Sequence, residues 1–335
     1  MRLFKPRRPR IPVRRLQASI QAAAALMLAP ARLSASIGTA LAGVTEVSQF
    51  GGNPGRLRML VYKPPRLPAG APLIVVLHGC GQFAAPFATD AGWIAFAQER
   101  RLALLLPEQS ASNHHGRCFN WYRTDDVARG RGEALSIRHM VSAAVKRFRS
   151  DPRRVFIAGF SAGGAMTAAL LAAYPAVFAA GAVVAGIPVG CAHWPGQAVM
   201  QTQHPSLLRS RTALADAVRS ATRPRPTQKW PRLSIWTGLR DRTVAPGNAE
   251  LLGAQWSELH GLGAVPAVDE TAGAGWRRRA WGAPARPAVE LWTLAELGHG
   301  FPVDPSAPGG GREGPWVSAA GISAAQRIAR FWGIA

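Results

Sequence analysis

Residues 155–164, VFIAGFSAGG, combine an apolar run, a glycine-rich turn and the start of an alanine-rich segment. The apolar run is typical of a buried strand, the turn has the pattern G-x-S-x-G, and the alanine-rich segment is typical of a helix. The residues beside the serine must be small, because such a turn brings strand and helix into contact. Ser161 is then exposed at the turn, as a nucleophile has to be. The alternative is a small-residue turn that only packs a helix against a sheet.

An alternation of apolar and polar residues predicts a half-exposed strand at residues 57–61. Mainly apolar runs predict strands at residues 73–77, 102–106, 155–158, 182–185, 233–236 and 289–292. Helices are expected at residues 133–148, 162–174, 248–259 and 319–331. Strands that alternate with helices form parallel βαβ units. The predicted fold class is therefore α/β, with a mostly parallel central sheet and helices on both faces. Ligands of such sheets bind at the carboxyl ends of the strands, so the residues just after each strand are the functional candidates.

Two side chains that follow later strands are candidates to act together with Ser161. Asp241 and His299 each follow one of the expected strands in the C-terminal half. Serine becomes nucleophilic when a histidine takes its proton and a carboxylate orients that histidine. With a serine on this kind of turn the chain order is serine, acid, histidine, which Ser161, Asp241 and His299 follow. We therefore predict these three as the catalytic residues.

Other acids compete with Asp241. Glu296 is the closest rival, since it lies only three positions before His299. Asp269 and Glu270 are expected in a loop before a hairpin, which makes them weaker candidates.

Two backbone N–H groups are expected to bind the oxyanion that forms when a carbonyl is attacked. Ala162 follows the serine at the start of a helix, where N–H groups are free to donate. The second group is assigned to Cys80, in HGCGQ at residues 78–82, because the glycines let the backbone turn its amide into the pocket. Cys80 takes part through its backbone and not through its thiol. The reaction that these groups support needs no metal and no organic cofactor.

The composition indicates one large globular domain with a strongly basic surface. Of the 335 residues, 48% are hydrophobic and 17% are charged, and the formal net charge is +22. Nearly all the basic residues are arginines, which are scattered beyond the N-terminus without interleaved aromatic residues, so we expect no nucleic-acid partner. The alternative is attraction to anionic surfaces. The three cysteines match no zinc motif; either one bridge with a free thiol or three buried thiols fit the sequence.

Residues 1–43 differ from the body of the chain. A basic start is followed by the short apolar run IQAAAALMLA at residues 20–29 and by Ala29-Pro30-Ala31, an order that resembles a signal peptide. This predicts an extracellular or periplasmic protein; a cytoplasmic basic amphipathic helix is the alternative. The run is too short to span a membrane, and no other segment is expected to do so. Residues 44–335 are predicted to form the catalytic domain.

Several strings in the body resemble the polyhydroxybutyrate-depolymerase-like esterases, a branch of the α/β-hydrolase fold related to feruloyl and acetylxylan esterases. The matching strings are LHGCGQ (77–82), PEQ (107–109), CFNWY (118–122), GFSAGGAM (159–166) and the segments that contain Asp241 and His299. They extend over most of residues 44–332. The resemblance implies a Ser161–Asp241–His299 triad, an oxyanion hole at Cys80 and Ala162, and hydrolysis of carboxylic esters.

The same resemblance has implications for the region of Cys118. It places Asn120 and Trp121 near the mouth of the site as substrate-binding residues, although Trp121 fits equally well as a core tryptophan. It also makes Cys80 and Cys118 the expected disulfide pair in an exported protein.

We expect a serine esterase that forms an acyl-enzyme on oligomers of 3-hydroxybutyrate or other hydroxyalkanoates, or on short-chain esters. Because the sequence ends directly after its last expected helix, soluble substrates are favoured over insoluble polyester. The alternatives are a feruloyl or acetylxylan esterase acting on plant polysaccharide, a peptidase, and a non-enzymatic binding protein on a hydrolase scaffold.

Residues 194–230 are long for a loop and are interpreted either as a lid over the site or as a surface excursion. The sequence leaves the oligomeric state open.

Overall fold

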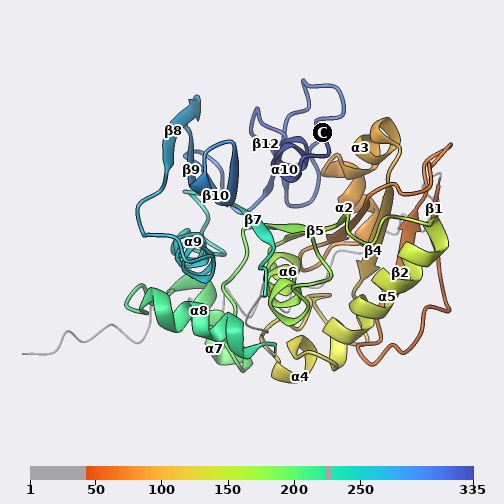
Figure 1. Cartoon of the computed structure of the whole chain (residues 1–335), viewed down its shortest axis with the longest axis horizontal. Helices are drawn as coiled ribbons and strands as arrows, with labels where there is room; N and C mark the ends of the chain where they lie inside the picture. Colours follow the sequence, from red (N-terminus) through yellow and green to blue (C-terminus); the bar gives the residue numbers. More distant parts are fainter. Residues whose placement is uncertain (1–42, 223–227) are drawn as a thin grey trace, which may run out of the picture.

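The computed structural model describes residues 43–222 and 228–335, and residues 1–42 of the predicted N-terminal segment lie outside these ranges. Figure 1 shows a twisted central sheet with helices packed on both sides. The strands are β1 (Val44–Glu46), β2 (Arg58–Tyr62), β3 (Leu73–Leu77), β4 (Ala103–Glu108), β5 (Val155–Phe160), β6 (Ala180–Val184), β7 (Arg232–Gly238), β8 (Val268–Gly273), β9 (Trp276–Ala283), β10 (Arg286–Leu294), β11 (Phe301–Val303) and β12 (Val317–Ala319). The helices are α2 (Ala84–Asp90), α3 (Trp93–Arg100), α4 (Thr124–Val127), α5 (Gly132–Phe148), α6 (Ala162–Ala173), α7 (Pro195–Gln203), α8 (Arg211–Ser220), α9 (Gly247–Leu259) and α10 (Ala324–Trp332).

Within the described ranges, ten strands form one sheet in the order β1-β2-β4-β3-β5-β6-β7-β10-β9-β8. The central neighbours from β4 to β10 pair in parallel, while both edges of the sheet are antiparallel. The carboxyl ends of β3, β5, β7 and β10 therefore lie along the same edge of the sheet. The loops that follow these strands contain the residues predicted for catalysis.

The central strands are apolar throughout because both faces of the sheet are covered. Leu73, Val75 and Leu77 of β3 belong to a core cluster built with α5, α6, α8 and α9. Ile74 and Val76 belong to a second cluster on the other face, built with α2, α3 and α10. A strand buried on both faces loses the polar alternation of a surface strand. The predicted α/β class is confirmed.

Each strand expected from the sequence overlaps a strand of the main sheet, but two local predictions were wrong. The helix expected to begin at residue 319 begins at Ala324, because residues 317–319 form β12, which pairs in parallel with β11. Gly321 then turns with a positive φ of 65°, and the side chain of Ser323 caps the helix. Asp269 and Glu270 lie on β8 and not in a loop, since β8 pairs with β9.

The described part of residues 194–230 contains α7 and α8, which pack onto α9. The Gln201 side chain donates to Asn248, and Gln255 donates to the Leu214 carbonyl. Leu214 and Val218 are buried, whereas Leu207 and Leu208 are largely exposed. Residues 223–227 lie outside the described ranges.

Among the residues described, no helix is both long enough and apolar enough to cross a membrane.

Candidate active site

Ser161 lies at the turn between β5 and α6 with backbone angles φ 55° and ψ −119°. This left-handed φ is uncommon for a residue with a side chain and is typical of strained functional turns. A Cβ on Gly159 would collide with the Gly163 carbonyl, and a Cβ on Gly163 would collide with the carbonyls of His78 and Leu77. The glycines are therefore required for the close contact of strand, turn and helix at Ser161. Ser161 itself is only 9% exposed, so the expectation from the sequence that it is exposed at the turn was wrong; the close packing of strand, turn and helix covers it.

A chain of hydrogen bonds joins Ser161 to His299 and Asp241. The His299 Nε2 atom lies 3.0 Å from Ser161 Oγ, and its Nδ1 atom lies 2.7 Å from Asp241 Oδ2. The backbone N–H groups of Thr243 and Val244, each 2.8 Å away, donate to Asp241 Oδ1. A carboxylate only accepts hydrogen bonds, so the Nδ1 atom of neutral His299 carries the proton and Nε2 is left to accept the serine proton.

The rival acids lie elsewhere. Glu296 is exposed and forms an ion pair with Arg240. Asp269 pairs with Arg277 on the outer hairpin, and Glu270, beside it on β8, pairs with Arg278. Of the acids considered, the structure brings Asp241 to His299.

The loop after β3 lies directly against the serine turn. A Cβ on Gly79 would collide with the Phe160 ring, and α6 begins against the carbonyls at the end of β3. The backbone N–H groups of Cys80 and Ala162 therefore belong to two segments that are in van der Waals contact.

His78 holds the peptide group that carries the Cys80 N–H. Its Nε2 atom accepts from the Gln109 backbone N–H at 3.1 Å, so Nδ1 is protonated and donates to the Gly79 carbonyl at 2.7 Å. The Gly79 carbonyl and the Cys80 N–H share one planar peptide group and point in opposite directions. Burial lowers the pKa of His78 and keeps the ring neutral. His78 thereby fixes the direction of the Cys80 N–H.

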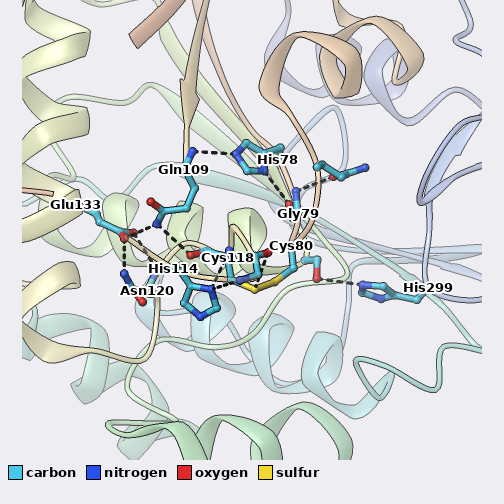
Figure 2. The surroundings of a disulfide bond; sticks show 12 residues. His78, Gly79, Cys80, Gln109, His114, Cys118, Asn120, Glu133 and His299 are labelled. Atoms are coloured by element: carbon cyan, nitrogen blue, oxygen red, sulfur yellow. Dashed lines mark hydrogen bonds between the residues drawn. A yellow bond between two sulfur atoms is a disulfide. The ribbon is translucent and has the colours of Figure 1, made fainter. Parts of the chain in front are cut away.

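The Cys80–Cys118 disulfide links this loop to a buried polar cluster (Figure 2). At the centre of the cluster is Glu133, a fully buried residue of α5. Its carboxylate accepts from the side chains of Gln109, Asn113 and Asn120 and from the Asn120 backbone N–H. Sequence reasoning missed Glu133, because a glutamate near the start of a helix is ordinarily exposed.

We expect Glu133 to make stability fall as pH rises. Burial raises its pKa from 4.5 to about 7, although N–H donors from Asn120 and Gln109 oppose the rise. Between these two values the folded protein holds a proton that the unfolded chain has released, so the free energy of unfolding decreases with pH and levels off above about 7. The decrease is on the order of 3 kcal/mol.

Urea unfolding of the wild type and of Glu133→Gln, measured from pH 4.5 to 7.5, checks this expectation. The substituted glutamine has no titrating proton, so its stability profile should be flatter than that of the wild type. Parallel profiles for the two proteins would contradict the assignment.

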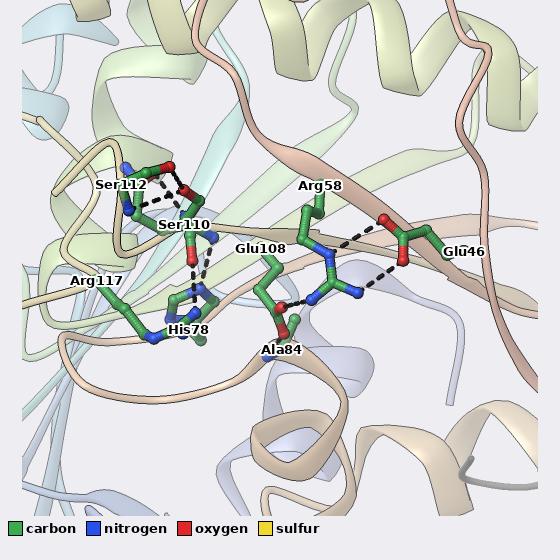
Figure 3. A network of polar contacts seen from close by, with 9 residues as sticks. Glu46, Arg58, His78, Ala84, Glu108, Ser110, Ser112 and Arg117 are labelled. Atoms are coloured by element: carbon green, nitrogen blue, oxygen red, sulfur yellow. Dashed lines mark hydrogen bonds and ion pairs between the residues drawn. The ribbon is translucent and has the colours of Figure 1, made fainter. Parts of the chain in front are cut away.

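A second buried carboxylate anchors the start of α2 (Figure 3). Glu108, at the end of β4, accepts from the Arg58 guanidinium at 2.5 Å and from the Ala84 backbone N–H at 2.9 Å. Arg58 also pairs with Glu46 of β1. This network connects three strands to the helix that follows the Cys80 loop and so keeps that loop in place.

The two residues expected to bind substrate have different surroundings. Asn120 is only 2% exposed, and its side-chain amide donates to Glu133 at 2.7 Å. Trp121 is half-buried and packs against Tyr122 and against the cluster that includes Leu214 of α8. The burial of Asn120 favours a supporting role over substrate contact.

The His299 ring contacts two aromatic residues of opposite exposure. Phe160 is buried, with its ring centroid 5.0 Å from that of the imidazole. Trp316 is 42% exposed, with a centroid distance of 5.8 Å and a T-shaped arrangement. Nothing in the sequence around Trp316 indicated that it lies beside His299.

No group of three or more His, Cys, Asp or Glu side chains in residues 43–222 and 228–335 is arranged to hold a metal ion.

The sheet, the serine turn and the Ser161–His299–Asp241 chain define a hydrolase of the α/β-hydrolase fold. Residues 57–278 match the family described as esterase PHB depolymerase. Poly(3-hydroxyalkanoate) depolymerase C from Paucimonas lemoignei is 37% identical over 311 residues, covering 92% of this chain and 74% of that protein. The chain belongs to this esterase family and is an ester hydrolase.

Two further proteins are similar to this chain. Feruloyl esterase B from Thermothelomyces thermophilus is 33% identical over 246 residues, covering 72% of this chain and 83% of that protein. The solved structure of an acetyl xylan esterase from Aspergillus awamori has a TM-score of 0.74 and 21% identity, and the match covers 87% of this chain and 99% of that one. This structural likeness concerns the fold.

Proposed function

We propose that Ser161 is the nucleophile of the ester hydrolysis, with His299 as its general base and Asp241 as the group that orients His299. Ser161 attacks the ester carbonyl while His299 Nε2 takes the hydroxyl proton. His299 then gives that proton to the leaving alcohol, and the acyl group stays on Ser161. Water releases the acid by the same steps. The observation that carries this proposal is the hydrogen-bonded chain from Ser161 through His299 to Asp241.

The oxyanion hole in this proposal consists of the backbone N–H groups of Cys80 and Ala162. The contact between the Gly79 and Phe160 segments supports it, because these segments adjoin Cys80 and Ala162 in the chain. Loss of one oxyanion donor lowers kcat by about 10²–10³ in serine hydrolases.

The proposed catalytic unit is residues 44–335, and α7 and α8 are proposed to cover one side of its site. The packing of Leu214 in one cluster with Ala165, just after the serine turn, supports this position. Trp121 joins the same cluster at its edge and is retained as the substrate-binding candidate.

The proposed substrates are oligomers of 3-hydroxybutyrate or related hydroxyalkanoates and short-chain esters. The similarity to a poly(3-hydroxyalkanoate) depolymerase supports this class over the length of the chain. Feruloyl and acetylxylan esters are the second candidates, favoured by the similarity to feruloyl esterase B.

A comparison of kcat/KM for 3-hydroxybutyrate trimer, methyl ferulate and acetylated xylo-oligosaccharide tests the substrate class. We expect the trimer to be preferred by at least about tenfold, since small differences in pocket fit change specificity by this amount. A preference for methyl ferulate or for the acetylated sugar would replace the first candidate by the second.

The proposed location is outside the cytoplasm. The Cys80–Cys118 disulfide supports export, because disulfides persist in oxidising compartments. Cleavage after the apolar run in residues 1–43 is part of the same proposal.

A further inference from the structure

Trp316 occupies a turn position that ordinarily requires glycine. The N–H of Gly314 donates to the Val317 carbonyl and the N–H of Val317 donates to the Gly314 carbonyl, which closes a turn around Pro315 and Trp316. Trp316 has a φ of 62°, whereas the proline ring holds its own φ near −65°. A negative φ followed by a positive φ defines a type II turn, in which the second central residue is usually glycine.

The turn carries one of the largest side chains where the smallest would fit best. A positive φ is disfavoured for a bulky residue, because the Cβ approaches the following carbonyl oxygen. Conformations of this kind persist where the surrounding structure holds them, and they are frequent at functional sites. The chain therefore keeps a tryptophan here at a conformational cost.

Three hydrogen bonds connect the turn to the Cys80 loop and to the histidine loop. Gln82 Nε2 donates to the Pro315 carbonyl at 2.6 Å, and Gln82 Oε1 accepts from the Gly79 N–H in the Cys80 loop. The Phe301 N–H donates to the Trp316 carbonyl at 2.8 Å, two residues after His299. The position of the Trp316 ring is thus tied to the Cys80 loop and to the histidine loop together.

The exposed Trp316 ring lies beside the imidazole that must protonate the leaving group. When the tetrahedral intermediate collapses, the bond from the former carbonyl carbon to the alcohol oxygen breaks, and that oxygen takes the proton from His299 Nε2. The alcohol is therefore next to His299 at that moment, while the acyl part is held on Ser161. The centroid of the Trp316 ring lies 5.8 Å from that of the imidazole, so the ring is positioned to contact an alcohol held next to His299.

We propose that Trp316 is a specificity-determining residue that forms the wall of the leaving-alcohol subsite and selects esters whose alcohol presents an apolar face. This inference rests on the proposed function, because it takes His299 as the proton donor to the alcohol. Trp316 acts by contact with the alcohol and takes no part in proton transfer.

The test compares ethyl acetate with 2-phenylethyl acetate, which share the acyl group and have alcohols of similar acidity. For Trp316→Gly we expect kcat/KM to fall about tenfold on 2-phenylethyl acetate and to stay within about twofold on ethyl acetate. Trp316→Phe, which keeps a ring, should recover most of the loss. Arg66→Gly is the matched control: Arg66 also has a positive φ, 56°, but is exposed outside the site, so both esters should be hydrolysed as by the wild type.

Three results would overturn the inference. An equal loss on both esters would show that the ring supports the histidine and does not select the alcohol. A loss that follows acyl length, from ethyl acetate to ethyl hexanoate, would move Trp316 to the acyl side. A wild type as inert as Ser161→Ala on every ester would remove the proposed function itself, and this inference with it.

Discussion

Ser161→Ala is expected to lower kcat by about 10⁶-fold, to the level left by binding and the oxyanion hole alone. The methyl group of alanine cannot form the acyl-enzyme. Among the described residues, Ser161 supplies the one side-chain hydroxyl that is hydrogen-bonded to His299 Nε2. The measurement is hydrolysis of p-nitrophenyl esters from acetate to palmitate. The chain length that the wild type prefers also gives the size of the acyl pocket.

Ser206→Ala is the matched control, because it removes the same hydroxyl from an exposed serine away from the turn. Its activity should equal that of the wild type. Since Ser161 makes its side-chain hydrogen bond to His299, the thermal unfolding of Ser161→Ala should remain close to that of the wild type. A Ser161→Ala protein that keeps more than a tenth of the activity would contradict the assignment of the nucleophile.

Asp241→Asn is expected to lower kcat by about 10⁴-fold while the fold is retained. The Oδ1 atom of residue 241 is held by the N–H groups of Thr243 and Val244, so the oxygen of an asparagine stays there. Its NH₂ group then faces His299 Nδ1 and donates to it. The proton of the imidazole is forced onto Nε2, which can no longer accept the proton of Ser161.

Glu296→Gln is the control for this prediction. Glu296 is also an acid near His299 in sequence, but it is exposed and paired with Arg240. Exposed ion pairs contribute little free energy, so activity should change by less than about twofold. Both variants are compared by their initial rates on p-nitrophenyl acetate. A larger loss of activity in Glu296→Gln than in Asp241→Asn would assign the acid that orients His299 to Glu296 and not to Asp241.

Most of the sheet could be predicted because its strands carry a local signal. β3, β4 and β5 are apolar over their whole length, and a run of that kind identifies a strand buried on both faces. The start of α10 was mispredicted because β12 forms only by pairing with β11, a contact between distant segments. Asp269 and Glu270 were expected in a loop for the same reason. Their segment is polar, and it becomes the strand β8 only by pairing with the arginines of β9.

Of the candidate site, too, one part could be predicted from the sequence and another part could not. The serine turn needs glycines at fixed spacing, and Asp241 and His299 follow strands in a recognisable order, so these residues are visible in the sequence. The residues that support them are not visible in the sequence. Glu133 lies on α5, Gln109 directly follows β4 and Trp316 lies in a late turn, and no spacing along the chain relates them to Ser161.

The sequence by itself determined the fold class, the serine turn and the order of the residues proposed for catalysis, because each depends on neighbours in the chain or on the ends of parallel strands. The tertiary structure decided which acid meets His299, how His78 directs the Cys80 N–H, and that an exposed tryptophan lies beside the imidazole. These are contacts between segments distant in sequence. They depend on distances of a few ångströms that arise only when the sheet has formed and the loops at its edge have packed together.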